Sequence, residues 1–475
     1  MAFQLRRPIL VGGIALSFGL WLWEGVHGSI ADLGELGLFG AIALGTGVWF
    51  FQRRGLNQLS SSTPPVDRQT VVEVIARTEV AIAQLETEAD RPDLIGELRQ
   101  RLTQLTHELD RQAIQLTVTG GKGVGKTRLV QVLESYWLPQ QLQSLTLQET
   151  PPLFVGNEAK DMPSASDLIL FVISGDLTDT EFQTLQQLRA VHQRILLVFN
   201  KQDQYLPPER AIIWQQLRQR LAGELAAEDV VAISAAPAPV KVRQHQPDAS
   251  VQEWMEEQTP DLAVLTQRLN QILEREAQQL IWTSTMRATV ALKAEVKTVL
   301  NHVRRDRALP TIEQYQWIAA ATAFANPVPA LDLLATAAIS GQLILDLGGI
   351  YQQKFSLSQA GESAKTLSSL MLKLGLVELS TQAIGSILKS NALTYVAGGA
   401  LQGVSAAYLT RLAGLSLIEY FQEQEVGDNS ATEQPLNLER LGQKLQKVFQ
   451  QNQRAAFLQD FVQQALGRLR LLAAS

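Results

Sequence analysis

The chain has 475 residues, enough for about three domains beyond any membrane anchor. Its net charge of −6 and the lack of a basic patch with interleaved aromatic residues argue against a nucleic-acid partner. Because the sequence contains no cysteine, disulfides, thiolate metal sites and cysteine nucleophiles are excluded, and the five histidines form no ligand cluster.

Two uncharged apolar runs come first, at residues 8–23 and 36–51. As helices they would each be about 24 Å long, at the short end for crossing the hydrocarbon core. The charges around them are Arg6, Arg7, Arg53 and Arg54 outside the pair, and Glu24, Asp32 and Glu35 between the runs. The positive-inside bias therefore predicts a transmembrane helical hairpin over residues 1–59, with both ends in the cytoplasm. The alternative is a cleaved signal peptide, but the first run lacks a small-x-small cleavage site.

Residues 60–112 carry a helical pattern after a short polar linker. Apolar residues recur at steps of three and four on either side of the polar break at residues 90–93. They are Val71, Ile75, Ile82 and Leu85, then Ile95, Leu98, Leu102, Leu105 and Leu109. This spacing predicts a helical hairpin or a short coiled coil. Two roles stay open: dimerisation, or packing against other helices of the same chain.

A glycine-rich loop follows a strand-like run at residues 113–119 and precedes a helical pattern at 127–136. Its residues are Gly120, Gly121, Lys122, Gly123, Val124, Gly125, Lys126 and Thr127. Glycines let backbone N–H groups approach phosphates closely, at the N-terminus of the next helix. The spacing predicts that Lys126 reaches the β- and γ-phosphates and that Thr127 binds Mg²⁺. The neighbouring Arg128 is assigned to the same nucleotide site.

A second polar loop, Asn200-Lys201-Gln202-Asp203, follows the apolar run at residues 194–199. Asp203 can accept two hydrogen bonds from the N–H groups of guanine, a donor pair that adenine lacks. Lys201 would lie along the base and the sugar, and Asn200 would tie this loop to the phosphate loop. Further strand patterns at 168–173 and 230–233 alternate with helical patterns at 179–192 and 209–221. This alternation predicts a parallel sheet with its ligand at the C-terminal ends of the strands.

Taken in this order, the two motifs resemble Era-type GTPases of the TRAFAC class. The resemblance implies GTP or GDP and Mg²⁺ as ligands, over a domain at residues 113–250. It also assigns Ser234 and Ala235 to a short motif whose backbone N–H contacts guanine O6, although Ala236 replaces the usual lysine.

The hydrolytic part of the resemblance is weaker. Such GTPases carry Asp-x-x-Gly after the third strand, where this chain has Glu149-Thr150-Pro151-Pro152 after residues 145–148. Glu149 could hold Mg²⁺ together with Thr127, but Pro152 has no N–H to offer the γ-phosphate. The segment from Thr127 to Glu149 is short for a switch loop, and Thr146 and Thr150 are the only candidate switch threonines.

The candidate catalytic residues are accordingly Lys126, Lys122 and Glu149. Lys122 stands where many GTPases have glycine, and one hypothesis is that it supplies the positive charge of an arginine finger. The alternative is a solvated lysine at the rim of the loop. Binding with slow hydrolysis is therefore the expectation.

The C-terminal half is expected to be helical. Residues 235–250, with three prolines, predict a linker, and residues 251–313 a connecting long helix that runs from 261 to about 307. Residues 314–425 form an apolar region, and its Pro-x-Pro kink near 327–329 and its Gly349-Ile-Tyr351 resemble a YcjF-like domain of unknown function. Residues 426–475 predict one amphipathic C-terminal helix, over about 436–472.

Two interpretations of the apolar region remain open: a soluble or membrane-touching bundle, or helices that enter the bilayer. Asp332 at a bilayer centre would cost about 3 kcal/mol or more. The apolar half by itself also fits a channel or transporter element.

The predicted fold is thus an α/β P-loop GTPase domain, with a parallel sheet flanked by helices, plus a large all-α domain and the transmembrane hairpin. The resemblance implies a bacterial protein of the inner or thylakoid membrane, with the bulk of the chain in the cytoplasm. Expected partners are guanine nucleotide, membrane lipid and a second copy of the chain. Nucleotide state would move the helical domain in a switch-like or dynamin-like manner. The alternative is a structural membrane scaffold with a degenerate nucleotide domain.

Overall fold

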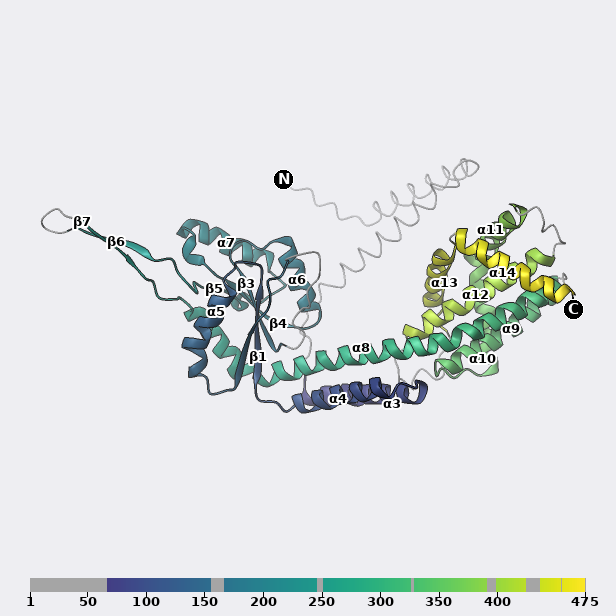
Figure 1. The fold of residues 1–475 in the computed structure, drawn as a ribbon, viewed down its shortest axis with the longest axis horizontal. Helices are drawn as coiled ribbons and strands as arrows, with labels where there is room; N and C mark the ends of the chain where they lie inside the picture. The colour runs from purple at the N-terminus through teal and green to yellow at the C-terminus, as the bar shows by residue number, and fades with distance from the viewer. Residues whose placement is uncertain are drawn as a thin grey trace, which may run out of the picture. The chain divides into compact units, whose positions relative to one another are not determined.

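The computed structural model describes residues 66–154, 166–245, 251–325, 329–390, 399–423, 436–453 and 455–474. The chain divides into two units, Met1–Pro65 and Val66–Ser475. The first unit, with the predicted transmembrane hairpin of residues 1–59, lies outside the described residues. The second unit combines a parallel sheet and a set of long helices (Figure 1).

The sheet has five parallel strands in the order β2-β1-β3-β4-β5. Their bounds are Ile114–Gly120 for β1, Leu145–Glu149 for β2, Leu168–Ile173 for β3, Arg194–Phe199 for β4 and Val230–Ala232 for β5. The two central apolar runs, β3 and β4, are buried on both faces, as expected of strands in a covered parallel sheet. At the edge, β2 alternates half-buried leucines with exposed polar residues.

In the central strands β3 and β4, alternate residues enter two different cores, one on each face of the sheet. Leu168, Leu170 and Val172 point to the face that α5 (Lys126–Val132) and the start of α8 (Ala263–Ala325) cover. Ile169, Phe171 and Ile173 point to the other face, under α6 (Asp179–Ala190) and α7 (Pro207–Arg220). The period-2 alternation of strand side chains therefore builds a sheet with helices on both faces.

The predicted linker at residues 235–250 is wrong. The chain there enters a two-stranded antiparallel ribbon of β6 (Val240–His245) and β7 (Val251–Glu256), which projects from the sheet in Figure 1. Pro237 and Pro239 precede β6, so they remove no ladder hydrogen bond from the ribbon. Opposite one another in the register lie Val242 and Trp254, residue types that favour strands.

The connecting helix does not end near residue 307 as predicted. Instead α8 runs without a break from Ala263 to Ala325, 63 residues and about 95 Å of helix at 1.5 Å per residue. It contains Pro310, which removes one backbone hydrogen bond. Ala308 and Ile312 on either side of this proline are buried in the helical core, and this packing offsets the loss.

Helices α3 (Arg68–Glu88) and α4 (Pro92–Glu108) lie side by side along the middle of α8 (Figure 1). Their apolar stripes form one core with the leucines and valines of that part of α8. At the end of α3, the buried Glu88 carboxylate pairs with Arg304 of α8, with Oε1 2.8 Å from Nη2. Both α3 and α4 therefore pack on a helix of their own chain.

The remaining helices surround a further, large core with the last third of α8. They are α9 (Pro329–Ile350), α10 (Leu357–Lys373), α11 (Leu376–Ser390), α12 (Gly399–Glu423), α13 (Leu438–Asn452) and α14 (Ala455–Ala474). The single C-terminal helix predicted over 436–472 is wrong, because the chain breaks between α13 and α14. After the break, the Phe461 ring stacks on Trp317 at 6.1 Å and meets Tyr408 edge-on at 5.7 Å.

Within the described residues, no helix taken singly has both the length and the apolar character to cross a bilayer. Taken as a pair bent by 65°, α10 and residues 376–388 of α11 meet that criterion by length and composition only.

Candidate nucleotide-binding site

Four loops meet at the C-terminal edge of the parallel sheet. The phosphate loop begins at Gly120 at the end of β1, and Glu149 ends β2 beside it. Asn200 follows β4 directly, and Ser234 lies just beyond β5. In open α/β sheets this edge is where ligands bind, so the topology brings the two predicted motifs to one place.

Two positions of the phosphate loop require glycine, because neighbouring atoms lie too close to leave room for a Cβ. A Cβ on Gly120 would lie 2.2 Å from the Val172 carbonyl oxygen of the next strand. A Cβ on Gly125 would lie 2.4 Å from Asn200 Nδ2, and its φ of +93° is in the left-handed region. Gly125 is also the N-cap of α5, so the loop leads directly into a helix N-terminus.

Lys126 folds back over this loop. Its ammonium donates hydrogen bonds to the carbonyl oxygens of Gly120 at 3.0 Å and Gly121 at 2.9 Å, and the residue is only 5% exposed. Burial lowers the pKa of Lys126 from its usual 10.5, and the nearby Glu149 carboxylate partly opposes this. To bind an anion, this ammonium would have to leave the two carbonyl groups.

Thr127 and Glu149 contact each other. The Thr127 hydroxyl donates to Glu149 Oε1 at 2.8 Å, between the start of α5 and the end of β2. A hydroxyl and a carboxylate are oxygen ligands that suit Mg²⁺, which takes its remaining ligands from phosphates and water. In the described part of the chain no cluster of three or more His, Cys, Asp or Glu side chains could hold a metal.

Asn200 joins three loops through both atoms of its amide. Its Nδ2 donates to the Val124 carbonyl oxygen of the phosphate loop at 2.9 Å. Its Oδ1 accepts from the Ala235 N–H at 3.0 Å, and the side chain is buried, with 2% exposed. The predicted tie between the guanine loop and the phosphate loop is present in this geometry.

Lys201 and Asp203 occupy different positions in the same loop. Lys201, with a φ of +62°, donates from Nζ to the Gly123 carbonyl oxygen at 2.9 Å. Asp203 Oδ2 accepts from the Ala238 N–H at 3.1 Å. Its other oxygen, Oδ1, is buried and has no hydrogen-bond partner. A buried carboxylate oxygen without a partner costs free energy, which the two N–H donors of a guanine edge would recover.

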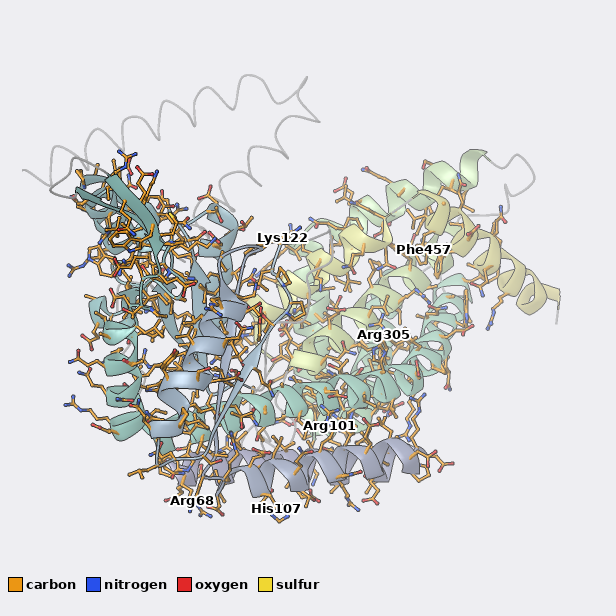
Figure 2. The ribbon with its side chains drawn as sticks, turned by 60° about the vertical axis from the view of Figure 1, so that its left-hand side comes forward. Arg68, Arg101, His107, Lys122, Arg305 and Phe457 are labelled. Carbon is orange, nitrogen blue, oxygen red and sulfur yellow. The ribbon has the colours of Figure 1, made fainter. Side chains whose placement is uncertain are left out.

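Four predicted site residues are bonded elsewhere or point to solvent. The Ser234 N–H donates to the Asp261 carbonyl oxygen and the Ala235 N–H to Asn200, so neither is left for guanine O6. Arg128 donates to Gln131 Oε1, one turn further along α5, at 3.3 Å. Lys122 is exposed on the loop surface, as Figure 2 shows.

Beyond Glu149 the backbone follows β1 for four more residues. Thr150 donates from its hydroxyl to the Thr119 hydroxyl at 2.8 Å, and the Leu153 N–H donates to the Gly120 carbonyl oxygen at 3.1 Å. The position after Pro152 does carry an N–H, but that group is already used in holding the phosphate loop.

Sequence reasoning missed Asp261, which lies outside both motifs. Its Oδ2 accepts from Gln202 Nε2 at 3.3 Å, and its backbone pairs with Ser234. It is 59 residues from Gln202 along the chain, and a lone aspartate after a proline has no local signature.

A model of a domain of unknown function, DUF697, matches residues 289–470, which span the second half of α8 and the helices up to α14. No curated relative matches the chain.

Among solved structures, translation elongation factor SelB from Methanococcus maripaludis is 21% identical, with a TM-score of 0.21 over 26% of this chain and 30% of that one. An LAO/AO transport system kinase is 15% identical, with a TM-score of 0.27 over 54% of this chain and 92% of the kinase. LeoA, a bacterial dynamin GTPase from ETEC, is 12% identical, with a TM-score of 0.24 over 86% of this chain and 95% of LeoA. The chain thus spans less than a third of the elongation factor, and these scores are too low to add to the geometry.

Proposed function

We propose that this chain is a GTP-binding protein similar to Era-type GTPases and that its N-terminal residues anchor it in a membrane. The observation that carries the proposal is the meeting of Lys126, the Thr127–Glu149 contact and Asp203 at one sheet edge. Phosphate-binding and base-reading groups then contact the two ends of one nucleotide. The unpartnered Asp203 Oδ1 favours guanine, because adenine offers no pair of N–H donors at that position.

In this proposal each residue has one role. Lys126 leaves the carbonyl groups of the phosphate loop and binds the β- and γ-phosphates, while backbone N–H groups of the loop surround them. Thr127 and Glu149 bind the Mg²⁺ that neutralises the phosphates. Asn200 keeps the base-reading loop and the phosphate loop at a fixed separation.

Hydrolysis is slow in this proposal. Pro152 provides no N–H for the γ-phosphate, and the Leu153 N–H already donates to the Gly120 carbonyl oxygen. Faster turnover therefore requires a group from a partner or from a second copy of the chain. A scaffold with a degenerate nucleotide domain is the competing outcome, and it requires that the site bind no nucleotide.

The test is equilibrium titration of the full-length protein in detergent with fluorescent GTP, GDP and ATP, followed by a phosphate-release assay. We expect GTP and GDP to bind with similar affinity and ATP to bind at least about 100-fold more weakly. Binding without release of phosphate supports a switch that a partner activates. Failure of all three nucleotides to bind would leave only the scaffold.

The membrane part of the proposal has its own test. The charge pattern of residues 1–59 supports a helical hairpin with the nucleotide domain on the cytoplasmic side. Membranes that contain the full-length chain are washed at alkaline pH, which removes peripheral proteins. Retention in the pellet is the expected result, and full release into the supernatant would contradict an integral anchor.

A further inference from the structure

Residues at both ends of the β6–β7 ribbon form hydrogen bonds with the guanine-reading loop, residues 200–203. Ala238, two residues before β6, donates its N–H to Asp203 Oδ2 at 3.1 Å. Asp261, five residues after β7, accepts from Gln202 Nε2 at 3.3 Å. Segments at both ends of the ribbon, which Figure 1 shows, thus bond to two neighbouring residues of one loop.

Asp261 also fixes the start of the long helix to the sheet. Its backbone makes two hydrogen bonds with Ser234 beyond β5, each 3.0 Å long. Leu262 and Leu265 then enter the core on the α5 face, with 8% and 0% of their surface exposed. Helix α8 begins at Ala263, within two residues of these contacts.

These contacts continue the ones that join the two nucleotide loops. The Val124 carbonyl oxygen in the phosphate loop accepts from Asn200, and Asn200 accepts from the Ala235 N–H. Ser234, the preceding residue, pairs with Asp261. A series of hydrogen bonds of 3.3 Å or less therefore runs from the phosphate loop to the first turn of α8.

The middle and far parts of α8 are packed into two further cores. Further along, Leu292, Val296 and Leu300 pack with α3 and α4, and Ala308 and Ile312 lie in the core of the helical bundle. Packed cores rearrange between discrete states and do not deform continuously.

We propose that Asp261 is the positioning residue through which guanine binding acts on α8; the inference rests on the proposed function. The Asp261 carboxylate accepts a hydrogen bond from Gln202, next to the base-reading Asp203. A bound base reduces the motion of the loop. Through the Asp261 contact, the first turn of α8 also becomes less mobile. Conversely, the loss of this contact loosens the loop and weakens the binding of guanine nucleotides.

The carbonyl oxygen of an amide can replace the carboxylate in this contact, whereas a methyl group cannot. Asp261→Ala and Gln202→Ala are each expected to weaken GDP binding about threefold to tenfold, the effect of one lost hydrogen bond. Because both remove the same contact, the double variant is expected to be no weaker than either single variant. Asp261→Asn is expected to bind GDP as the unmodified chain does.

The matched control is Glu257→Ala, which removes an exposed carboxylate four residues earlier on the same segment. Hydrogen exchange of residues 263–275 is measured for each full-length variant with and without saturating GDP. We expect GDP to slow exchange there in the unmodified chain, in Asp261→Asn and in Glu257→Ala, and to have little effect in Asp261→Ala.

The outcomes separate this inference from the proposed function. If the unmodified chain binds no guanine nucleotide, both fail. If it binds GDP and Asp261→Ala behaves as Glu257→Ala does in affinity and exchange, the coupling alone is wrong. Additive effects of Gln202→Ala and Asp261→Ala would also overturn it, because the two side chains would then act independently.

Discussion

The two halves of the nucleotide site differ in how complete they are. On the base side, Asn200 uses both amide atoms, and Asp203 has one oxygen bonded and one buried without a partner. On the phosphate side, Lys126 is turned onto loop carbonyl groups and Pro152 lacks the N–H that a γ-phosphate would need. The base-reading half is preformed and the hydrolytic half is incomplete. Such a site is better suited to binding a nucleotide than to hydrolysing it.

Removal of the phosphate-binding ammonium is expected to have the largest effect. Lys126→Ala should weaken the binding of both GTP and GDP on the order of 100-fold, since a hydrogen-bonded charge is lost from the site. Isothermal titration measures this loss, and circular dichroism checks that the variant folds. Nearly unchanged affinity would show that the phosphates do not lie over this loop.

A change in base selectivity tests the other half of the site. Asp203→Asn replaces an acceptor by a group that can also donate, so it should weaken GDP binding about tenfold or more. The same variant should gain affinity for xanthosine diphosphate, whose C2 oxygen replaces the exocyclic amine. Pyrophosphate binding should not change and is the internal control. Equal losses for every nucleotide would indicate a damaged fold and not a base-reading role.

The metal contact is expected to give a smaller effect, specific to Mg²⁺. Glu149→Gln keeps an oxygen that can accept from Thr127 but removes the negative charge. GTP affinity in the presence of Mg²⁺ should fall about tenfold, while affinity in EDTA should be unchanged. A loss of the same size in both conditions would assign Glu149 to the structure of the loop.

Lys122 is expected to matter least for binding. Lys122→Ala should leave GDP affinity within about threefold, because its exposed ammonium contributes little at the rim of the loop. Any slow phosphate release should fall if Lys122 acts as an internal finger. Single-turnover hydrolysis by the unmodified chain and the variant decides this, and equal rates would remove the hypothesis.

The sequence was sufficient for features that are local. The loop from Gly120 to Thr127 and the tetrapeptide at Asn200 carry their chemistry in adjacent residues, and each follows an apolar run that became a strand. Because parallel strands end at one edge, the alternation of strands and helices also placed the two loops together. These inferences needed only spacing and periodicity.

Features that depend on tertiary packing were not predictable in this way. The long helix was expected to end near residue 307, but buried neighbours on both sides of Pro310 keep α8 continuous. Pro237 and Pro239 indicated a linker, yet they only precede the β6–β7 ribbon. Asp261 was missed because its partners, Gln202 and Ser234, are distant in the chain and carry no pattern that relates them to it.

The central claim is that two distant loops bind the same guanine nucleotide, and hydrogen exchange tests it most directly. With GDP, backbone amides of both residues 120–127 and residues 200–205 should exchange more slowly, whereas pyrophosphate should protect only the first segment. If GDP protects the phosphate loop alone, or neither segment, Asp203 does not read a base and the account is contradicted.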